Sequence, residues 1–280
     1  MLDLLIVGAG FGGLYMLHLA RQRGLKALVV EAAGGVGGTW YHNRYPGARV
    51  DIQSLEYSFG FDDALQQDWC WTERYAAQPE LLAYANHVAD RYRLRDGILL
   101  NTRLAGANWD EAAQCWQARA DDSRQPPRRW SARHLVLATG PLSTPATPDF
   151  PGIADFRGQV LHTARWPKEG ADLRGLRVGV IGTGSSGVQT ITTIAPEVAQ
   201  LTVFQRTPSY AVPAHNGPLD RDLEARIKAD YPGFRERNRA MMGGFGSLLP
   251  PNRISALSVS AEERTRMFEE RWQIGGFGLL

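Results

Sequence analysis

The sequence predicts an α/β chain with two dinucleotide-binding domains, each built on a parallel sheet. Two glycine-rich fingerprints carry this prediction. The first occupies residues 8–13 after an apolar run at 4–7, and the second occupies residues 182–187 after an apolar run at 178–181. One such pattern is weak evidence, because glycine is common and the pattern is short. Two copies, each between a strand-like run and a helix-like stretch, predict two Rossmann-like domains and two bound dinucleotides.

Length, charge and cysteine content limit the number of domains, the partners and the compartment that we expect. The chain has 280 residues, of which 44% are hydrophobic, enough for one large or two medium domains. Its net charge of +2, from 31 basic and 29 acidic residues, gives no reason to expect nucleic acid or an anionic membrane as a partner. Cys70 and Cys115 are too few for a disulfide framework or a structural zinc site, which favours a reduced, cytoplasmic compartment.

The apolar N-terminus is expected to be the first strand. Residues 1–7 lack a basic leader and a cleavage site, and they run straight into the first glycine turn, unlike a signal peptide. No uninterrupted apolar run in the sequence approaches the length of a membrane span, so we expect no membrane partner.

Each position of the first fingerprint has an expected task. Gly8 permits the tight turn, Gly10 lets the backbone approach a pyrophosphate, and Gly13 lets the following helix pack closely on the strand. A helix over residues 14–23 would direct its N-terminal amides and its positive dipole end at the phosphates. Glu31 follows the second strand-like run, 23 residues after Gly8, where a carboxylate can accept hydrogen bonds from ribose hydroxyls. The alternative is a glycine-rich turn with a surface glutamate.

A long segment over residues 34–51 is rich in glycine, aromatic and arginine residues. Such glycine density makes a poor helix or strand. The rings and cations of this segment could line a flat cofactor, and Asp51 could point into that site. A purely structural loop is the alternative of equal weight.

The rest of the first domain mixes helical and strand patterns. Residues 79–95 have helical spacing, the runs 104–109 and 115–120 predict a hairpin, and residues 135–138 predict a strand that returns the chain to the first sheet. We expect three aromatic residues in the core and four arginines in a solvated turn. These are Trp69, Trp71 and Tyr75, and Arg124, Arg128, Arg129 and Arg133.

The predicted domains are an FAD-type first domain over residues 1–140 and a second dinucleotide domain over residues 153–280. The stretch 141–152 contains four prolines and no periodicity, and it indicates a stiff linker. Within the second domain, residues 208–280 are expected to form part of a helical insertion. Two amphipathic helices are predicted there, over 219–238 and 261–272.

The second site is predicted from a strand at 177–181, a helix at 187–194 and a strand at 201–204. The position 23 residues after Gly182 is Gln205 rather than an acid, and Arg206 and Thr207 follow. A carboxylate would repel a 2′-phosphate, whereas an arginine can pair with it, so the second site is predicted to prefer NADP over NAD. An incidental surface arginine is the alternative.

Two hydroxyl residues follow the second glycine of this fingerprint. Ser185 and Ser186 add hydroxyl groups near the expected phosphates, and Thr183 is placed to do the same. Capping of the helix N-terminus is the alternative task for these side chains.

A twelve-residue stretch, FRGQVLHTARWP at 156–167, lies between the linker and the second fingerprint. It matches the pattern F-x-G-x-x-x-H-x-x-x-W-P at every defined position. The residues at 38–51, from Gly-Thr-Trp through Tyr-Pro-Gly to the aspartate, and Gln-Arg-Thr-Pro at 205–208 are also typical of the same proteins. Over nearly its whole length the chain resembles the Baeyer–Villiger monooxygenases, a group of class B flavoprotein monooxygenases.

The resemblance implies FAD in the first site, NADPH in the second, and insertion of an oxygen atom from molecular oxygen beside the carbonyl of a ketone. By position it implies an FAD-binding set, a set bordering the flavin, an NADPH-binding set and a hinge set. The FAD-binding set is Gly8, Gly10, Gly13 and Glu31, and the set bordering the flavin is Trp40, Arg44 and Asp51. The NADPH-binding set is Gly182, Gly184, Ser186, Gly187, Arg206 and Thr207, and the hinge set is His162 and Trp166. Taken alone, His162 and Trp166 would be interpreted as packing residues.

The resemblance also implies a longer protein. The family's active-site arginine stands in a Lys-Arg pair, and no such pair occurs in this sequence. We therefore expect a C-terminally incomplete, two-domain flavoprotein of doubtful activity alone, which a second polypeptide could complete. The alternatives are a non-catalytic nucleotide-binding remnant and an N- or S-oxidising flavin monooxygenase. A disulfide reductase is set aside, because its redox cysteines must lie close in sequence.

Overall fold

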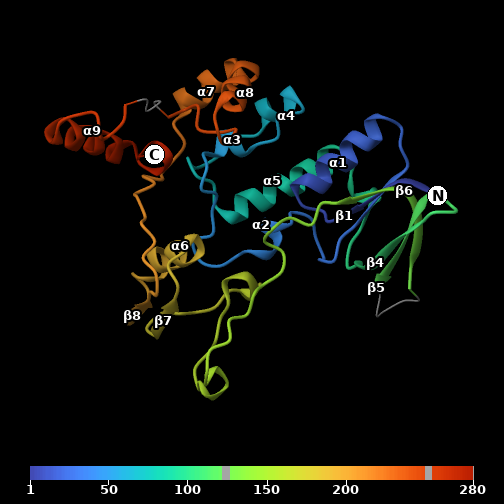
Figure 1. The fold of residues 1–280 in the computed structure, drawn as a ribbon, viewed down its shortest axis with the longest axis horizontal. Helices are drawn as coiled ribbons and strands as arrows, with labels where there is room; N and C mark the ends of the chain where they lie inside the picture. Colours follow the sequence, from blue (N-terminus) through green and yellow to red (C-terminus); the bar gives the residue numbers. More distant parts are fainter. Residues whose placement is uncertain (122–126, 250–253, 280) are drawn as a thin grey trace. The chain divides into compact units, whose positions relative to one another are not determined.

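The computed structural model describes residues 1–280 apart from 122–126, 250–253 and 280. The chain divides into two compact units, each made of two stretches of sequence (Figure 1). The first unit comprises Met1–Tyr45 and Pro79–Asp172, and the second comprises Pro46–Gln78 and Leu173–Leu280.

The first unit is built on a six-stranded sheet in the order β3-β2-β1-β6-β5-β4. The first four of these strands run parallel, and β5 and β4 continue the sheet as an antiparallel hairpin. In register, Leu5 pairs with Leu28 on one side and with Leu135 on the other. The strands are β1 (Leu2–Val7), β2 (Ala27–Val30), β3 (Ile98–Leu99), β4 (Arg103–Asp110), β5 (Cys115–Asp121) and β6 (Arg129–Leu137).

Both faces of the central strands are buried, as their continuous apolar sequence predicts. Leu4 and Ile6 face helices α1 (Phe11–Gln22) and α5 (Gln78–Arg91), whose side chains Leu14, Leu17, Ala85 and Ala89 belong to the same buried cluster. The alternate residues Leu5 and Val30 pack on the opposite face against Ala118 and Ala132. This two-sided core holds the carboxyl end of β1, where the first fingerprint begins.

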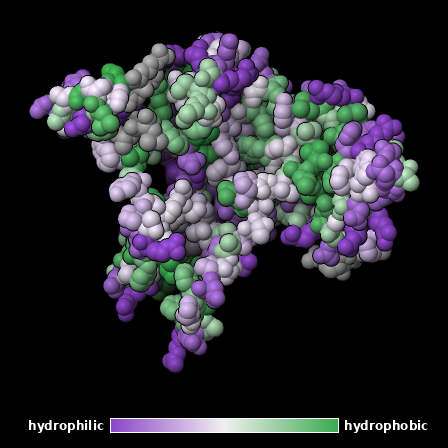
Figure 2. All heavy atoms as spheres, viewed as in Figure 1, coloured by the Kyte–Doolittle hydropathy of each residue, from purple (hydrophilic) through white to green (hydrophobic). Residues whose placement is uncertain are grey.

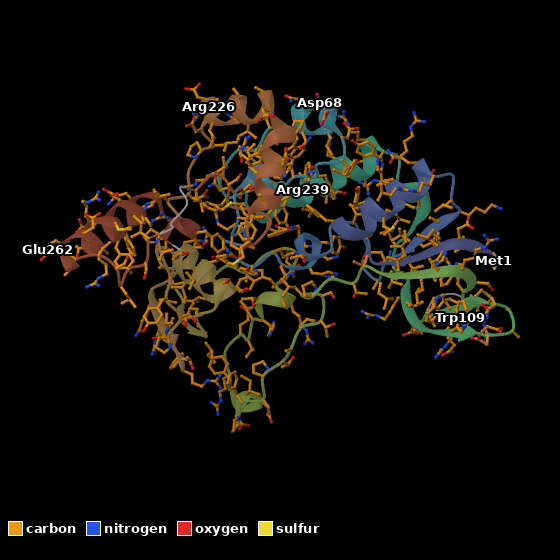
Figure 3. The ribbon with its side chains drawn as sticks, turned by 45° about the horizontal axis from the view of Figure 1, so that its top comes forward. Met1, Asp68, Trp109, Arg226, Arg239 and Glu262 are labelled. Carbon is orange, nitrogen blue, oxygen red and sulfur yellow. The ribbon has the colours of Figure 1, made fainter. Side chains whose placement is uncertain are left out.

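Short helices complete the first unit. They are α2 (Thr39–His42), η1 (Arg95–Gly97), η2 (Ile153–Asp155) and η3 (Thr163–Arg165). Trp109 lies close to the turn of the β4–β5 hairpin and is exposed (Figure 3).

The second unit contains a two-stranded parallel sheet, a helix that follows its first strand, and a helical group. The sheet pairs β7 (Arg177–Ile181) with β8 (Gln200–Phe204), and α6 (Ser185–Ile194) connects them. In the helical group, α4 (Asp63–Asp68) lies beside α7 (Arg221–Ala229) and α8 (Tyr231–Ala240) (Figures 1 and 3). Two hydrogen bonds join them, since Lys228 Nζ donates to the Gln67 carbonyl and Arg235 Nε donates to Gln66 Oε1. The helices are α3 (Ser54–Tyr57), α4 (Asp63–Asp68), α7 (Arg221–Ala229), α8 (Tyr231–Ala240), α9 (Ala261–Ile274) and η4 (Gly276–Leu279).

Two sequence expectations for local structure are wrong. The single helix expected over 219–238 is two helices, because Asp230 accepts a hydrogen bond from the Gly233 amide and Pro232 stands in the first turn of α8. Strand β6 begins at Arg129 rather than at 135, so Arg129 and Arg133 lie on a strand and not in a turn. Arg124 lies outside the described residues.

The expected aromatic core is confirmed in part. Trp71 and Tyr75 are buried, whereas Trp69 is half-buried and packs edge-on against Trp71. In the described parts of the chain, no helix is both long and apolar enough to cross a membrane.

The two compact units differ from the expected domains at one place above all. The segment Pro46–Gln78 groups with the second unit. Its backbone pairs internally, with the Val50 amide donating to the Ala76 carbonyl, and the Leu219 amide donates to the Thr72 carbonyl. The division into domains at 140 and 152 stays a prediction.

Candidate functional site: two dinucleotide cradles

The first glycine fingerprint forms a turn that excludes side chains. Gly8 has φ +104°, and its amide donates to the Val30 carbonyl at 2.8 Å. A Cβ at Gly8 would lie 2.5 Å from the Ala138 carbonyl oxygen. A Cβ at Gly13 would come closer than 3.0 Å to the Gly8 carbonyl oxygen. Helix α1 therefore packs on β1 as closely as its glycines permit, as the sequence predicts.

The second fingerprint repeats this geometry. Gly182 has φ +102°, and its amide donates to the Phe204 carbonyl at 2.9 Å. A Cβ at Gly187 would again come closer than 3.0 Å to the carbonyl oxygen of the first glycine. Among the described residues, a Cβ at Gly184 would meet no atom within 4 Å. The predicted task of Gly184, to admit the close approach of a pyrophosphate, stays a prediction.

Both fingerprint helices begin without a side-chain cap. The N-cap of α1 is Gly10 and that of α6 is Gly184, both with extended backbone, and neither first turn contains an acidic residue. The first amides of each helix have no partner within the helix and carry its positive dipole end. Ser185 and Ser186 lie within α6 rather than at its cap, so they do not cap it. Both cradles thus fit an anion such as a pyrophosphate.

The glycine-rich segment after β2 lies directly on the first fingerprint. The Gly37 amide donates to the Ala9 carbonyl at 3.0 Å. A Cβ at Gly38, whose φ is +54°, would lie 2.8 Å from the Cα of Gly10. Two backbones meet here without side chains between them. The segment therefore has at least a structural task beside the cradle.

Glu31 is buried beside the first cradle, with 7% of its surface exposed. Its Oε2 accepts a hydrogen bond from the Ala9 amide at 2.6 Å, and its Oε1 accepts one from the Ala33 amide at 2.7 Å. The interpretation of Glu31 as a surface glutamate is therefore wrong. The carboxylate joins the fingerprint turn to the loop after β2, and each oxygen keeps a further lone pair for a ribose hydroxyl.

Trp40 and Arg44 belong to the first unit, and Arg44 shares the Tyr41 ring with a second cation, Lys168. Trp40 is buried in α2. The guanidinium of Arg44 lies 5.3 Å from the centre of the Tyr41 ring and donates to the Tyr41 carbonyl. Lys168 Nζ donates to the Tyr41 hydroxyl at 3.2 Å and lies 5.3 Å from the same ring centre. Tyr41 and Lys168 are 127 positions apart, so no local pattern indicates their contact.

Asp51 is exposed and belongs to the second unit. The chain before it is held by Arg49, whose Nη1 forms an ion pair with Glu73 Oε2 at 2.8 Å. Ser54 follows, and its hydroxyl oxygen accepts a hydrogen bond from the Ala76 amide at 2.8 Å. The predicted roles of Trp40, Arg44 and Asp51 beside a flavin stay predictions.

His162 and Trp166 lie in the twelve-residue stretch that carries the resemblance. His162 Nδ1 accepts a hydrogen bond from the Ala164 amide at 3.1 Å, and its Nε2 lies 3.0 Å from the Ala146 carbonyl oxygen. Because Nδ1 is an acceptor, Nε2 carries the proton and donates to that carbonyl. The ring thus ties the predicted linker to the start of η3. Trp166 is buried in the first unit.

Arg206 and Thr207 follow β8 and are exposed. Gln205, which stands where an NAD site has its acid, donates from Nε2 to the Thr183 hydroxyl at 2.9 Å. This bond joins the end of β8 to the fingerprint turn after β7. The second unit thereby holds its fingerprint glycines, Thr183 and Gln205 together, with Arg206 next along the chain.

The chain matches known proteins over nearly its whole length. The family model described as pyridine nucleotide-disulphide oxidoreductase matches residues 2–231. A Baeyer-Villiger monooxygenase of Pseudooceanicola batsensis is 43% identical over 277 residues, which are 98% of this chain and 49% of that relative. The phenazine N-monooxygenase PhzNO1 of Lysobacter antibioticus is 41% identical over 282 residues, which are 99% of this chain and 50% of that relative.

Solved structures match equally well. An oxidized steroid monooxygenase bound to NADP is 51% identical, with a TM-score of 0.89 over 98% of this chain and 51% of that chain. The OTEMO complex with FAD and NADP is 38% identical, with a TM-score of 0.91 over 99% of this chain and 52% of that chain. The chain spans about half the length of the relatives it matches. The resemblance to Baeyer–Villiger monooxygenases is confirmed, and the chain belongs to the pyridine nucleotide-disulphide oxidoreductase family.

Proposed function

We propose that the chain binds FAD at the first fingerprint and NADPH at the second, as part of a flavin-dependent monooxygenase of the Baeyer–Villiger type. The observation that carries the proposal is the repeated cradle. The same turn, with a first glycine near φ +100° and a helix that begins on an uncapped glycine, occurs after β1 and after β7. The relatives named above include a structure with both FAD and NADP.

The first cradle would hold the ADP half of FAD. The amides at the start of α1 bind the pyrophosphate, Gly10 admits its close approach, and Glu31 accepts from the ribose. Trp40, Arg44 and Asp51 would border the flavin ring. When bound, the flavin and NADPH supply the electrons and the oxygen-transfer chemistry. The protein's part is to bind and orient them and to exclude water.

The second cradle would hold NADPH. The amides at the start of α6 bind its pyrophosphate, and Ser186 and Thr207 supply further hydroxyl donors. The residue before Arg206 in the sequence is Gln205, which stands where an NAD site has its acid. A guanidinium there pairs with the 2′-phosphate that distinguishes NADP from NAD.

A ketone is the proposed substrate and molecular oxygen the co-substrate, in a reduced, cytoplasmic setting. His162 and Trp166 would join the hinge that couples the motion of the two nucleotide sites to turnover. An N-oxidising reaction is the second candidate, because one relative of similar identity is named a phenazine N-monooxygenase.

The small sheet of the second unit supports a further part of this proposal. Ile181, Val203 and Phe204 are 62%, 40% and 55% exposed, and Figure 2 shows hydrophobic side chains at the surface over β7 and β8. Parallel sheets are normally covered on both faces. We propose that additional polypeptide, in the same or a second chain, covers β7 and β8 in the working enzyme. If it does not, the chain is a nucleotide-binding remnant that lacks monooxygenase activity.

Substitution of the fingerprint glycines by alanine tests the cradles. Gly184→Ala places its methyl where no atom of the described residues lies within 4 Å, so the fold is expected to be unchanged. The methyl instead occupies the path of the pyrophosphate, and we expect the NADP⁺ dissociation constant to rise at least about tenfold, as for one lost charge-assisted hydrogen bond. FAD binding should be unchanged.

The matched control is Gly217→Ala, which lies in the same unit but outside both fingerprints, and whose new methyl would also meet no described atom within 4 Å. Both nucleotides should bind this variant as they bind the wild type. Binding is measured by calorimetric titration, and folding by circular dichroism. If Gly184→Ala binds NADP⁺ with wild-type affinity, or if the wild-type chain binds neither nucleotide, the proposal is wrong.

A further inference from the structure

The segment that carries Asp51 rests on the helix that follows the second fingerprint. Both belong to the second unit. Gly47 has φ +79°, and a Cβ there would come closer than 3.0 Å to the Gln189 carbonyl oxygen and the Thr193 hydroxyl of α6. The backbone of the segment therefore touches α6 with no room for a side chain between them, and only glycine suits both the dihedral angle and the space.

A side chain of α6 also reaches back to the segment. Gln189 Nε2 donates a hydrogen bond to the Arg49 carbonyl at 3.2 Å. Arg49 lies two residues before Asp51, and Gln189 lies one helical turn after Ser185, the first residue of α6. One hydrogen bond thus spans from the turn next to the proposed pyrophosphate site to the backbone that leads to Asp51.

The opposite side of the segment is firmly held. The Val50 amide donates to the Ala76 carbonyl at 3.1 Å, and the Gln78 amide donates to the Ala48 carbonyl at 2.8 Å. Ala48 and Val50 are themselves buried. With one edge paired to residues 76–78 and the other against α6, the segment has little freedom to absorb a shift of the helix. A shift of α6 is therefore passed on to it.

We propose that Gln189 is a positioning residue that couples occupancy of the second dinucleotide site to the placement of Asp51. The inference rests on the proposed function, in which NADP binds at the first turn of α6. An anion there orders the first turn, and the hydrogen bond from the Thr190 hydroxyl to the Ser186 carbonyl at 2.8 Å ties that turn to the next one, which carries Gln189. The segment before Asp51 is then held more tightly while NADP is bound.

Hydrogen exchange of the whole chain tests the coupling. In the wild type we expect saturating NADP⁺ to slow amide exchange in the peptide over residues 46–54 about fivefold, the factor that corresponds to one net hydrogen bond. Gln189→Met keeps the length of the side chain and removes its donor. In this variant the NADP⁺ dissociation constant should stay within about twofold of wild type, while the slowing is lost.

Thr192→Ala is the matched control on the same helix. The Thr192 hydroxyl donates to two carbonyls of its own helix, that of Val188 at 2.9 Å and that of Gln189 at 3.1 Å, and its loss leaves the Gln189 side-chain amide in place, so this variant should show the wild-type slowing. Gly47→Ala is a second test of the coupling, because its methyl would push the segment that carries Asp51 away from α6. It should abolish the slowing with NADP⁺ affinity retained.

The outcomes separate the two proposals. If NADP⁺ binds the wild type but exchange over 46–54 does not slow, or if the slowing persists in Gln189→Met, the coupling is wrong and the proposed function stands. If the wild type does not bind NADP⁺, the proposed function is wrong and the coupling falls with it. A merely structural role for Gln189 would raise exchange equally with and without nucleotide, which would also overturn the coupling.

Discussion

The buried carboxylate of Glu31 gives a sharp test of how the first cradle is held together. Glu31→Gln keeps the size of the side chain but replaces one acceptor oxygen with an NH₂ group. The two oxygens accept from the Ala9 and Ala33 amides at 2.6 and 2.7 Å, so one of these amides would face a donor in the variant. The remaining oxygen can satisfy only one of the two amides.

The magnitude follows from these two bonds. A hydrogen bond to a charged group contributes about 1.5–3 kcal/mol, and an unsatisfied buried amide costs a similar amount. Since one bond is lost and the other loses its charge, we expect the free energy of unfolding to fall by about 2 kcal/mol. For a chain of this size that lowers the melting temperature by roughly 4–8 °C.

Thermal and urea unfolding followed by circular dichroism measure this change. The matched control is Glu111→Gln, because Glu111 lies exposed on the β4–β5 turn and bonds the exposed Trp109 indole. It should unfold as the wild type does. FAD affinity should fall in Glu31→Gln and stay unchanged in Glu111→Gln. A Glu31→Gln variant as stable as the wild type would refute the structural role assigned to this carboxylate.

Two further predictions concern the second unit. Burial raises the pKa of Glu56 above its ordinary value, although the Gly246 amide and the charge of Arg235 oppose the shift. The folded state therefore binds the Glu56 proton more tightly than the unfolded state does. The stability that this proton contributes is fully present below the ordinary pKa of a glutamate and is lost as the pH rises through the pKa of the folded state. Melting temperatures of the wild type and Glu56→Gln, compared from about pH 4 to about pH 8, should show the wild type losing stability relative to the variant as the pH rises; a constant difference would contradict this. Arg206→Ala should raise the NADP⁺ dissociation constant about tenfold, as for one lost charge-assisted hydrogen bond, and leave the NAD⁺ dissociation constant unchanged. As a control, Arg226→Ala, at an exposed position on α7 (Figure 3), should change neither constant. Equal losses of affinity for NADP⁺ and NAD⁺ would exclude a contact of Arg206 with the 2′-phosphate.

The strands and helices of both cradles could be predicted from the sequence because their requirements are local. The turn after β1 and the turn after β7 each need glycine within six consecutive residues, and the apolar runs before them need no distant partner to be recognised. The break at Asp230 also had a local signal, a capping aspartate two residues before Pro232. The early start of β6 had a weaker local signal. Its first residues include charged side chains, and they form a strand only through pairing with β5.

The sequence by itself determined that two dinucleotide cradles exist, since backbone dihedral angles and the absence of a Cβ are properties of single residues. Only the tertiary structure decided what surrounds them. The hydrogen bond of Ala9 to Glu31, the contact of Lys168 with Tyr41, and the hydrogen bond of Gln189 to Arg49 join residues that are 22, 127 and 140 positions apart. Such contacts depend on how sheets and helices pack, and packing is a property of the whole chain that no local spacing encodes.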